Sequence, residues 1–219
     1  RVAWVEPSDS GELTQVRSET DIRILDDELS RPIGPVTLHL GAVQVSEQVV
    51  GYQRRDVQTR ELLGTEDLDL PPSCLVTRAF WLTIDERVLT RAGVVPADWP
   101  GTLHAAEHAM IGMLPLFTIC DRWDVGGVST PLQADTGRPT IVVYDGYPGG
   151  VGYVKAAARQ FARWVKAARD LLRNCPCEAG CPRCVLSPKC GNGNQYLDKQ
   201  AALALAETLA AAYPSPMGN

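Results

Sequence analysis

The stretch from Asn174 to Asn194, NCPCEAGCPRCVLSPKCGNGN, contains five of the seven cysteines of the chain, spaced C-x-C-x3-C-x2-C-x5-C. Zinc prefers four thiolates in a tetrahedron about 2.3 Å from the metal, and a C-x2-C knuckle supplies two of them from one tight turn. Gly180 and Pro182 flank the knuckle Cys181–Cys184, as such a turn requires. The stretch has too few apolar residues to fold alone, so we expect it to fold around one structural Zn²⁺.

Five cysteines for four ligand positions leave one over. The compact set predicts Cys175, Cys177, Cys181 and Cys184 as the ligands, and the alternative replaces Cys175 by Cys190. An iron–sulfur cluster is less compatible, because the spacing is tighter than in the ferredoxin patterns. A redox-active set of thiols is the other interpretation. The remaining cysteines, Cys74 and Cys120, stand alone in apolar surroundings and are predicted to be core residues.

Composition argues against a secreted disulfide framework and against a membrane protein. The 219 residues are 45% hydrophobic, enough for a core, and contain neither a run of eighteen apolar residues nor a signal peptide. We therefore expect a soluble, cytoplasmic protein whose thiols stay reduced. The chain begins within an apparent strand, Val2–Val5, which predicts a fragment of a longer protein.

Charge is distributed unevenly along the chain. Residues 1–150 hold 12 Arg, no Lys and 22 acidic residues, a net charge of −10. Residues 151–219 hold 9 Lys or Arg and 4 acidic residues, a net charge of +5. Contact with a polyanion is therefore expected in the C-terminal third.

Hydrophobic patterning predicts an α+β fold with two regions, a β-rich accessory region over 1–95 and an α/β zinc-binding domain over 96–219. The first has alternating stretches at 36–45 and 74–84. In the second, Thr102 is the predicted N-cap of a helix of about fifteen residues. A loop over 121–139, a strand over 140–144, a helix over 153–172 and a last helix over 198–212 follow.

The first helix contains the pattern H-x-x-E-H at His104, Glu107 and His108. Histidines one helical turn apart can ligate a metal beside a general base, as in the inverted zinc-protease motif. A hydrolase needs a third ligand, which the sequence does not identify. We therefore interpret the three residues as a structural polar patch, with a metal-dependent hydrolase as the alternative.

Two further features point to anions. The loop DGYPGGVG, residues 145–152, precedes a helix, where backbone N–H groups can bind phosphate, but a tight turn that needs positive φ is the favoured interpretation. The helix that follows is rich in lysine and arginine. Either a solvent-exposed face or contact with phosphates explains these charges. The candidate DNA-binding residues there and in the cysteine stretch are Lys155, Arg159, Arg163, Lys166, Arg183 and Lys189.

The segments HAAEHAMIGMLPLF, DRWDVGGVSTP, YDGYPGGVG, CPCEAGCPRCVLSPKCGNGN and LDKQAA together resemble the C-terminal zinc-binding region of MrfA-type DNA helicases over about residues 100 to 205. The β region resembles the accessory segment after their helicase core. The resemblance implies one structural zinc on four cysteines, a bacterial, nucleoid-associated ATP-dependent 3′-to-5′ helicase acting in DNA repair, and motor domains in the same chain.

The resemblance implies an accessory role. Neither a Walker lysine nor a DEAH-like box is present, so this chain cannot hydrolyse ATP by itself. It would support the motor and the path of single-stranded DNA, with weak binding by the chain alone and Tyr196 as a possible stacking platform. The other function class is a protein-interaction module in which the acidic β region docks a partner or the motor.

Overall fold

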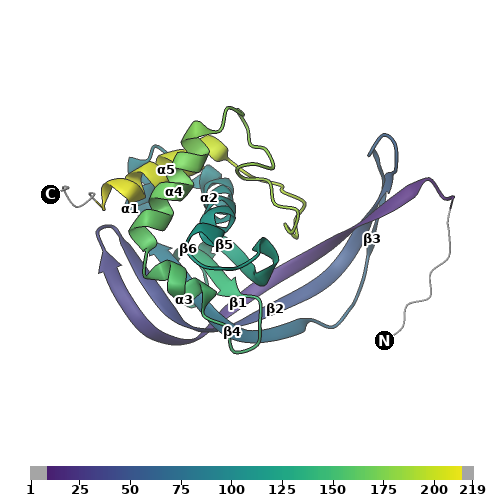
Figure 1. Ribbon diagram of the computed structural model, residues 1–219. Helices are drawn as coiled ribbons and strands as arrows, with labels where there is room; N and C mark the ends of the chain where they lie inside the picture. Colours follow the sequence, from purple (N-terminus) through teal and green to yellow (C-terminus); the bar gives the residue numbers. More distant parts are fainter. Residues whose placement is uncertain (1–8, 214–219) are drawn as a thin grey trace.

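One bent, antiparallel sheet carries the fold in the computed structural model, which describes residues 9–213 (Figure 1). Its order is β1-β2-β4-β6-β5, with β3 paired to β2. The strands are β1 (Glu12–Ile33), β2 (Val36–Asp56), β3 (Leu62–Asp67), β4 (Ser73–Ile84), β5 (Val125–Gln133) and β6 (Arg138–Asp145). The strand predicted at residues 2–5 lies outside the described residues.

The helices lie together on the concave side of the sheet, while the ribbon formed by β1, β2 and β3 extends beyond them (Figure 1). The α-helices are α1 (Glu86–Arg91), α2 (Trp99–Met113), α3 (Tyr153–Ala158), α4 (Phe161–Asn174) and α5 (Lys199–Ala211). Single 3-10 turns are η1 (Pro96–Asp98), η2 (Leu114–Leu116) and η3 (Arg122–Asp124). None of the helices within residues 9–213 is long and apolar enough to cross a membrane.

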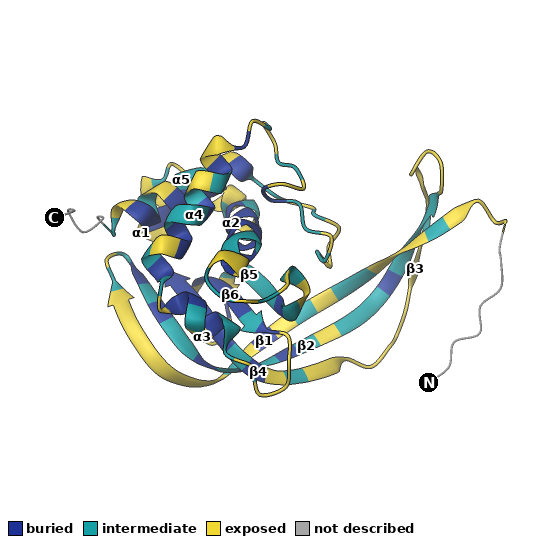
Figure 2. Cartoon of the chain, viewed as in Figure 1, coloured by how far each residue is buried: buried dark blue, intermediate teal, exposed yellow. Residues whose placement is uncertain are grey.

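Both faces of the sheet bury side chains at its centre. In β4, Phe80 and Leu82 belong to the core under the helices, whereas Trp81 belongs to a smaller cluster on the opposite face. This alternation follows from the two-residue period of a strand. In the part of the ribbon that extends beyond the helices, β1 and β3 are mostly exposed, whereas β2 between them is mostly half-buried (Figure 2). Cys74 is exposed, so the prediction that it is a core residue is wrong, whereas Cys120 is half-buried and packs against the core under the helices.

Irregular pairing bends the ribbon. The register of β1 on β2 shifts three times, between Arg17 and Ser18, between Ile24 and Asp26, and between Asp27 and Leu29. Each extra residue increases the local twist of the strand that contains it. Gly41 faces one such shift, and a Cβ there would lie 1.9 Å from the carbonyl oxygen of Asp26. The backbones can approach this closely only because position 41 has no side chain.

Two side chains join the opposite edges of the bent sheet. At the end of β5, the Gln133 amide donates to the carbonyl of Ile22 at 2.9 Å, and in the following turn the Asp135 carboxylate accepts from the N–H of Ile24 at 2.7 Å. Ile22 and Ile24 lie on β1, the edge strand at the far end of the strand order. The bend therefore brings the two edges close enough for side chains to bridge them.

The sheet also contains strands from both regions predicted on either side of residue 95. Ala79–Thr83 of β4 pairs with Thr140–Tyr144 of β6. Backbone hydrogen bonds thus connect residues before and after that position. The sequence-predicted loop over 121–139 is wrong in part, because β5 occupies Val125–Gln133.

Two helix predictions are corrected. Asp98, not Thr102, is the N-cap of α2; the Thr102 hydroxyl lies inside the helix and donates to the carbonyl of Asp98 at 2.8 Å. Pro100 starts this helix earlier, since proline is favoured in a first helical turn. The helix predicted over 153–172 is interrupted after Ala158, which separates α3 from α4.

Candidate metal centre and adjoining cavity

Four sulfur atoms meet in the loop between α4 and α5, which we call the cysteine loop (residues 175–198). The Sγ–Sγ distances are 3.5 Å for Cys175–Cys177, 3.5 Å for Cys175–Cys181, 3.4 Å for Cys177–Cys184 and 3.8 Å for Cys181–Cys184. A tetrahedron with zinc–sulfur bonds of about 2.3 Å has edges of about 3.8 Å. The four thiols therefore fit one zinc ion, and they are the compact set of the sequence prediction.

The knuckle is held by its own backbone. The N–H groups of Cys184, Val185 and Leu186 all donate to the carbonyl of Cys181, at 3.0 to 3.2 Å. Gly180 has φ 123°, and a Cβ there would lie 2.5 Å from Cγ2 of Val185. Glycine is thus required on both conformational and steric grounds. The turn points both knuckle sulfurs to one side.

Lys199, which the sequence analysis did not single out, supports the cluster from α5. Its side chain is only 4% exposed, and its ammonium donates to the carbonyl of Cys175 at 2.8 Å and to that of Cys177. Four thiolates and one Zn²⁺ carry two net negative charges, which a nearby buried cation offsets in part. The only sequence signal was a lysine at the start of an otherwise apolar, alanine-rich helix.

Cys190 lies apart from the four and faces α2. Its Sγ is 3.5 Å from Nε2 of His104 and accepts from the N–H of Asn194 at 3.3 Å. His104 and His108 follow one another along α2, with ring centroids 4.4 Å apart. The helix therefore presents both histidines of the H-x-x-E-H pattern to the cysteine loop.

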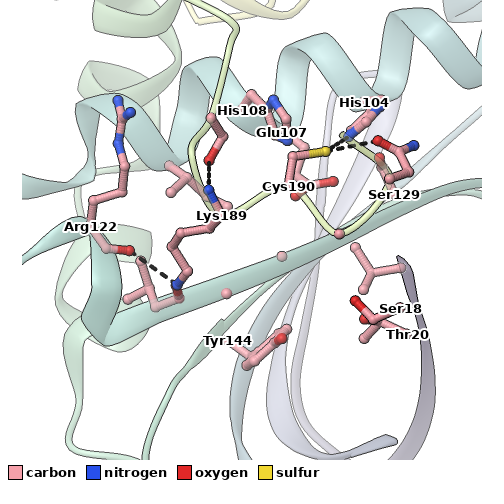
Figure 3. Close-up of a pocket in the computed structure, with 18 of the residues that line it drawn as sticks. Ser18, Thr20, His104, Glu107, His108, Arg122, Ser129, Tyr144, Lys189 and Cys190 are labelled. Atoms are coloured by element: carbon pink, nitrogen blue, oxygen red, sulfur yellow. Dashed lines mark hydrogen bonds between the residues drawn. The ribbon is translucent and has the colours of Figure 1, made fainter. Parts of the chain in front are cut away.

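These residues line a cavity of about 530 Å³ between α2, the cysteine loop and the sheet (Figure 3). Ser18 and Thr20 of β1 lie across it from His104. Burial lowers the pKa of His108 to about 4, and lowers that of His104. Burial also raises the pKa of Glu107 to about 7, against a hydrogen bond with Ser129 that lowers it. Both imidazoles are thus neutral at pH 7.

Gly127 of β5 packs directly under Glu107. A Cβ at position 127 would lie 2.5 Å from Oε1 of Glu107 and 2.7 Å from Cδ1 of Ile111. Because both neighbours are held on α2, we expect Gly127→Ala to lower the free energy of unfolding by about 1–3 kcal/mol. Urea denaturation measures this. Gly64→Ala in β3, where a Cβ meets only the guanidinium end of Arg54 at 3.1 Å, is the control and should change little. Equal losses in both variants would contradict the steric explanation.

The loop DGYPGGVG forms a tight turn that already binds an anionic group of the chain. The buried carboxylate of Asp145 accepts from the N–H groups of Val151, Gly152 and Val154 at 2.7, 2.6 and 3.0 Å. Gly149, Gly150 and Gly152 all have positive φ. The backbone donors that could have held a phosphate are therefore occupied, in agreement with the favoured interpretation of this loop.

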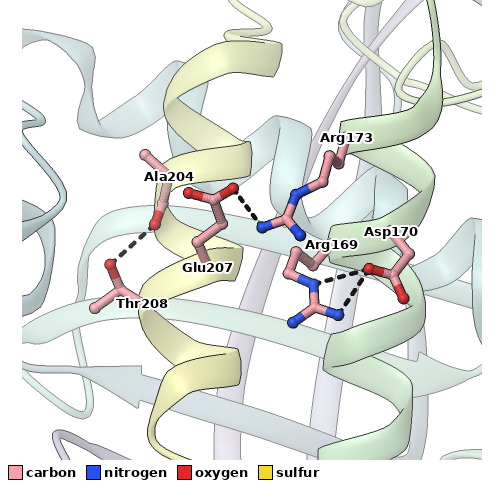
Figure 4. A network of polar contacts seen from close by, with 6 residues as sticks. All are labelled: Arg169, Asp170, Arg173, Ala204, Glu207 and Thr208. Carbon is pink, nitrogen blue, oxygen red and sulfur yellow. Dashed lines mark hydrogen bonds and ion pairs between the residues drawn. The ribbon is translucent and has the colours of Figure 1, made fainter.

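The candidate DNA-binding residues fall into two groups. Lys155, Arg159, Arg163 and Arg183 are exposed, and Lys166 is half-exposed. Lys189 instead points inward, where its ammonium donates to the carbonyls of Arg122 and Val125. Two other arginines of α4 are ion-paired, Arg169 with Asp170 and Arg173 with Glu207 of α5 at 2.7 Å (Figure 4). Arg163 donates to Oε1 of Gln160 at 2.6 Å and lies over the ring of Phe117. The exposed basic side chains Lys155, Arg159 and Arg163 lie toward the beginning of the basic segment.

Comparison with known proteins identifies related sequences. Residues 106–185 match the model of the MZB family, described as the MrfA Zn-binding domain. The chain is 31% identical over 186 residues to the ATP-dependent helicase YprA of Bacillus subtilis, covering 84% of this chain and 24% of YprA. It is 36% identical over 112 residues to the protein MJ1572.1 of Methanocaldococcus jannaschii, covering 49% of this chain and 98% of MJ1572.1.

A solved structure has the same fold. The crystal structure of the DUF1998 helicase MrfA bound to DNA superposes with a TM-score of 0.62 and 28% identity, over 92% of this chain and 26% of MrfA. The chain therefore spans about a quarter of the length of YprA and of MrfA. The structural match includes the β-rich region that the family model leaves out.

Proposed function

Because this chain belongs to the family of MrfA-type zinc-binding domains, we propose that it is the zinc-binding accessory part of an ATP-dependent DNA helicase. The observation that carries the proposal is the match of 92% of the chain to about one quarter of MrfA. The four-thiol cluster supports a structural zinc within it. The division into a β-rich region over 1–95 and a zinc-binding domain over 96–219 belongs to this proposal.

We also propose the activity of the parent helicase. It would translocate in the 3′-to-5′ direction in DNA repair, driven by motor domains that belong to the same protein. The reading frame that encodes this chain tests it. Walker A and DEAH-like motifs upstream of Arg1 are expected, and their absence would count against a helicase. Unwinding assays on the full-length protein, with tails of either polarity, would then establish the direction of movement.

The basic beginning of the α3–α4 segment is the proposed contact to single-stranded DNA. Lys155 on α3, Arg159 at the C-cap of α3 and Arg163 on α4 are exposed and carry charges that approach phosphates without sequence preference. Arg183 is exposed in the cysteine loop and could extend this contact, and Lys166 lies on the next turn of α4. Lys189 is the weakest of the candidates, because internal carbonyls occupy its ammonium. The net charge of −5 limits the affinity of the chain alone.

Replacing Lys155, Arg159 and Arg163 together by glutamine is expected to lower the affinity for single-stranded DNA. The affinity should also depend less steeply on salt concentration. Each lost phosphate contact lowers the slope of log affinity against log salt by about 0.7, so three lower it by about 2. Fluorescence anisotropy with an oligonucleotide at several salt concentrations measures both quantities.

The matched control replaces Arg87, Arg91 and Arg138 by glutamine, which removes the same charge at exposed positions on α1 and β6. If both triple variants lose affinity equally, only net charge matters and the proposed contact surface is wrong. Tight binding by the unmodified chain at physiological salt would contradict the expectation of weak binding.

Exposed apolar side chains on the ribbon favour a second candidate, a protein-interaction surface. Val16 of β1 and Leu62 and Leu63 of β3 are 55%, 49% and 46% exposed, on the two strands that flank β2. A motor domain of the same protein would cover them. Binding of isolated motor domains that survives glutamine substitution of the basic helix, but not Val16→Asp, would support this role.

A further inference from the structure

Three potential metal ligands converge at the cavity wall, outside the four-cysteine cluster. One ring nitrogen each from His104 and His108 and the Sγ of Cys190 all lie within 4.8 Å of one another. His104 and His108 lie on α2, and Cys190 lies in the cysteine loop. Cys190 follows His104 by 86 residues in the sequence. None of them belongs to the four-thiol cluster.

Hydrogen bonding fixes the tautomer of both imidazoles. Nδ1 of His108 lies 2.6 Å from the carbonyl of Val185, and Nδ1 of His104 lies 3.2 Å from the carbonyl of Gln195. A carbonyl can only accept, so each Nδ1 carries the hydrogen and each Nε2 keeps its lone pair. A histidine that donates one ring N–H to a backbone carbonyl and offers the other nitrogen is the usual arrangement at metal centres.

The backbone carbonyls come from the same loop that contains Cys190. Val185 directly follows the knuckle cysteine Cys184, and Gln195 lies five residues after Cys190. Folding of the loop around the first metal thus positions the acceptors that orient both histidines. The thiol of Cys190 meets Nε2 of His104, the nitrogen with the free lone pair.

We propose that His104, His108 and Cys190 form a second metal site, for a divalent ion of the zinc class, with three protein ligands and a fourth position open to the cavity. Imidazole nitrogen and thiolate sulfur together suit Zn²⁺ and exclude the hard cations Mg²⁺ and Ca²⁺. Three protein ligands and one exchangeable position distinguish such a site from the closed four-thiolate centre.

This site supplies the third ligand that the H-x-x-E-H pattern lacked in the sequence. Glu107 lies between the two histidines, is 5% exposed and lines the same cavity. Tyr144 and Ser129 also face this space, so a small polar ligand on the metal would have hydrogen-bonding partners. The proposal concerns metal binding and stands whether or not the parent protein is a helicase.

Zinc content per chain tests the site directly. The protein is stripped of metal under reducing conditions, reloaded with excess Zn²⁺, freed of weakly bound ion and analysed for zinc and protein. Two zinc ions per chain are expected for the unmodified protein, and one for Cys190→Ser and for His108→Asn. Serine keeps an acceptor for the N–H of Asn194, and asparagine keeps a donor for the carbonyl of Val185.

Cys74→Ser is the matched control, since this exposed thiol is outside both clusters and the variant should retain two ions. Thermal melting monitored by circular dichroism must show folded protein for each variant. If His108→Asn fails to fold, Cys190→Ser decides the question. One zinc in the unmodified protein, or two in folded Cys190→Ser, would overturn the proposal.

The absorption spectrum of bound Co²⁺ gives a second measurement of the site. It would not change on substitution if His104, His108 and Cys190 only stabilised the fold. Titration of the metal-free protein with Co²⁺ should show two phases, one from the four-thiolate centre and one with a different spectrum from the mixed imidazole–thiolate centre. Cys190→Ser should abolish only the second phase. A single phase that is identical in both proteins would overturn the proposal.

Discussion

Replacing Cys181 by serine is expected to remove the zinc of the four-thiol cluster and to unfold the cysteine loop together with the packing of α4 against α5. The loop has few buried apolar residues of its own, so we expect its order to depend on the metal. Structural zinc contributes about 10–16 kcal/mol in small zinc peptides, which is comparable with the whole stability of a domain. Zinc analysis and a thermal melt by circular dichroism on the same sample measure the two effects.

Cys74→Ser again serves as the control, because it removes one thiol without touching the cluster. It should keep both the zinc and the melting temperature. A Cys181→Ser protein that has lost zinc but melts like the unmodified chain would show that the metal does not hold this part of the fold.

Replacing Asp145 by alanine is expected to cost about 3–5 kcal/mol of unfolding free energy. The carboxylate is fully buried and is the hydrogen-bond acceptor for the N–H groups of Val151, Gly152 and Val154. Alanine would remove the acceptor from the buried N–H of Val154, worth about 1–3 kcal/mol, and from the part-buried N–H groups of Val151 and Gly152. Guanidinium denaturation followed by tryptophan fluorescence measures the loss.

Asp145→Asn should lower the free energy of unfolding less than Asp145→Ala does, because the amide oxygen of asparagine can still accept hydrogen bonds. Asp69→Ala is the control for removing a carboxylate at an exposed position and should be nearly neutral. If Asp145→Ala were no worse than Asp69→Ala, the turn would not depend on this internal anion.

Local patterns predicted the features whose causes are local. The spacing favoured Cys175, Cys177, Cys181 and Cys184, the thiols that the structure brings together, but left Cys190 open as a replacement for Cys175. The helical spacing of His104 and His108 placed both rings on one face of α2. The alternation in 74–84 gave β4. In each case the deciding sequence pattern spans only about ten residues of chain.

Other features depend on contacts between distant segments. The meeting of Cys190 with His104 joins residues 86 positions apart, and no local pattern encodes it. β5 was read as a loop because Gly126 and Gly127 lower strand propensity, yet a Cβ at either position would clash with Tyr144 or Glu107. The break after Ala158 has neither glycine nor proline; it lets Phe161 and Trp164 both reach Phe80, at 5.4 Å between centroids.

The bridge from the β5–β6 turn to β1 has a consequence for synthesis on the ribosome. Gln133 is synthesised 111 residues after Ile22. At about 5–20 residues per second, the edge of β1 therefore stays without the contact from Gln133 for about 5–20 s. During that interval an uncovered strand can pair with the edge of another nascent chain. The acidic residues of β1, among them Glu19, Asp21 and Asp26, repel identical copies and so protect the unfinished sheet from self-association.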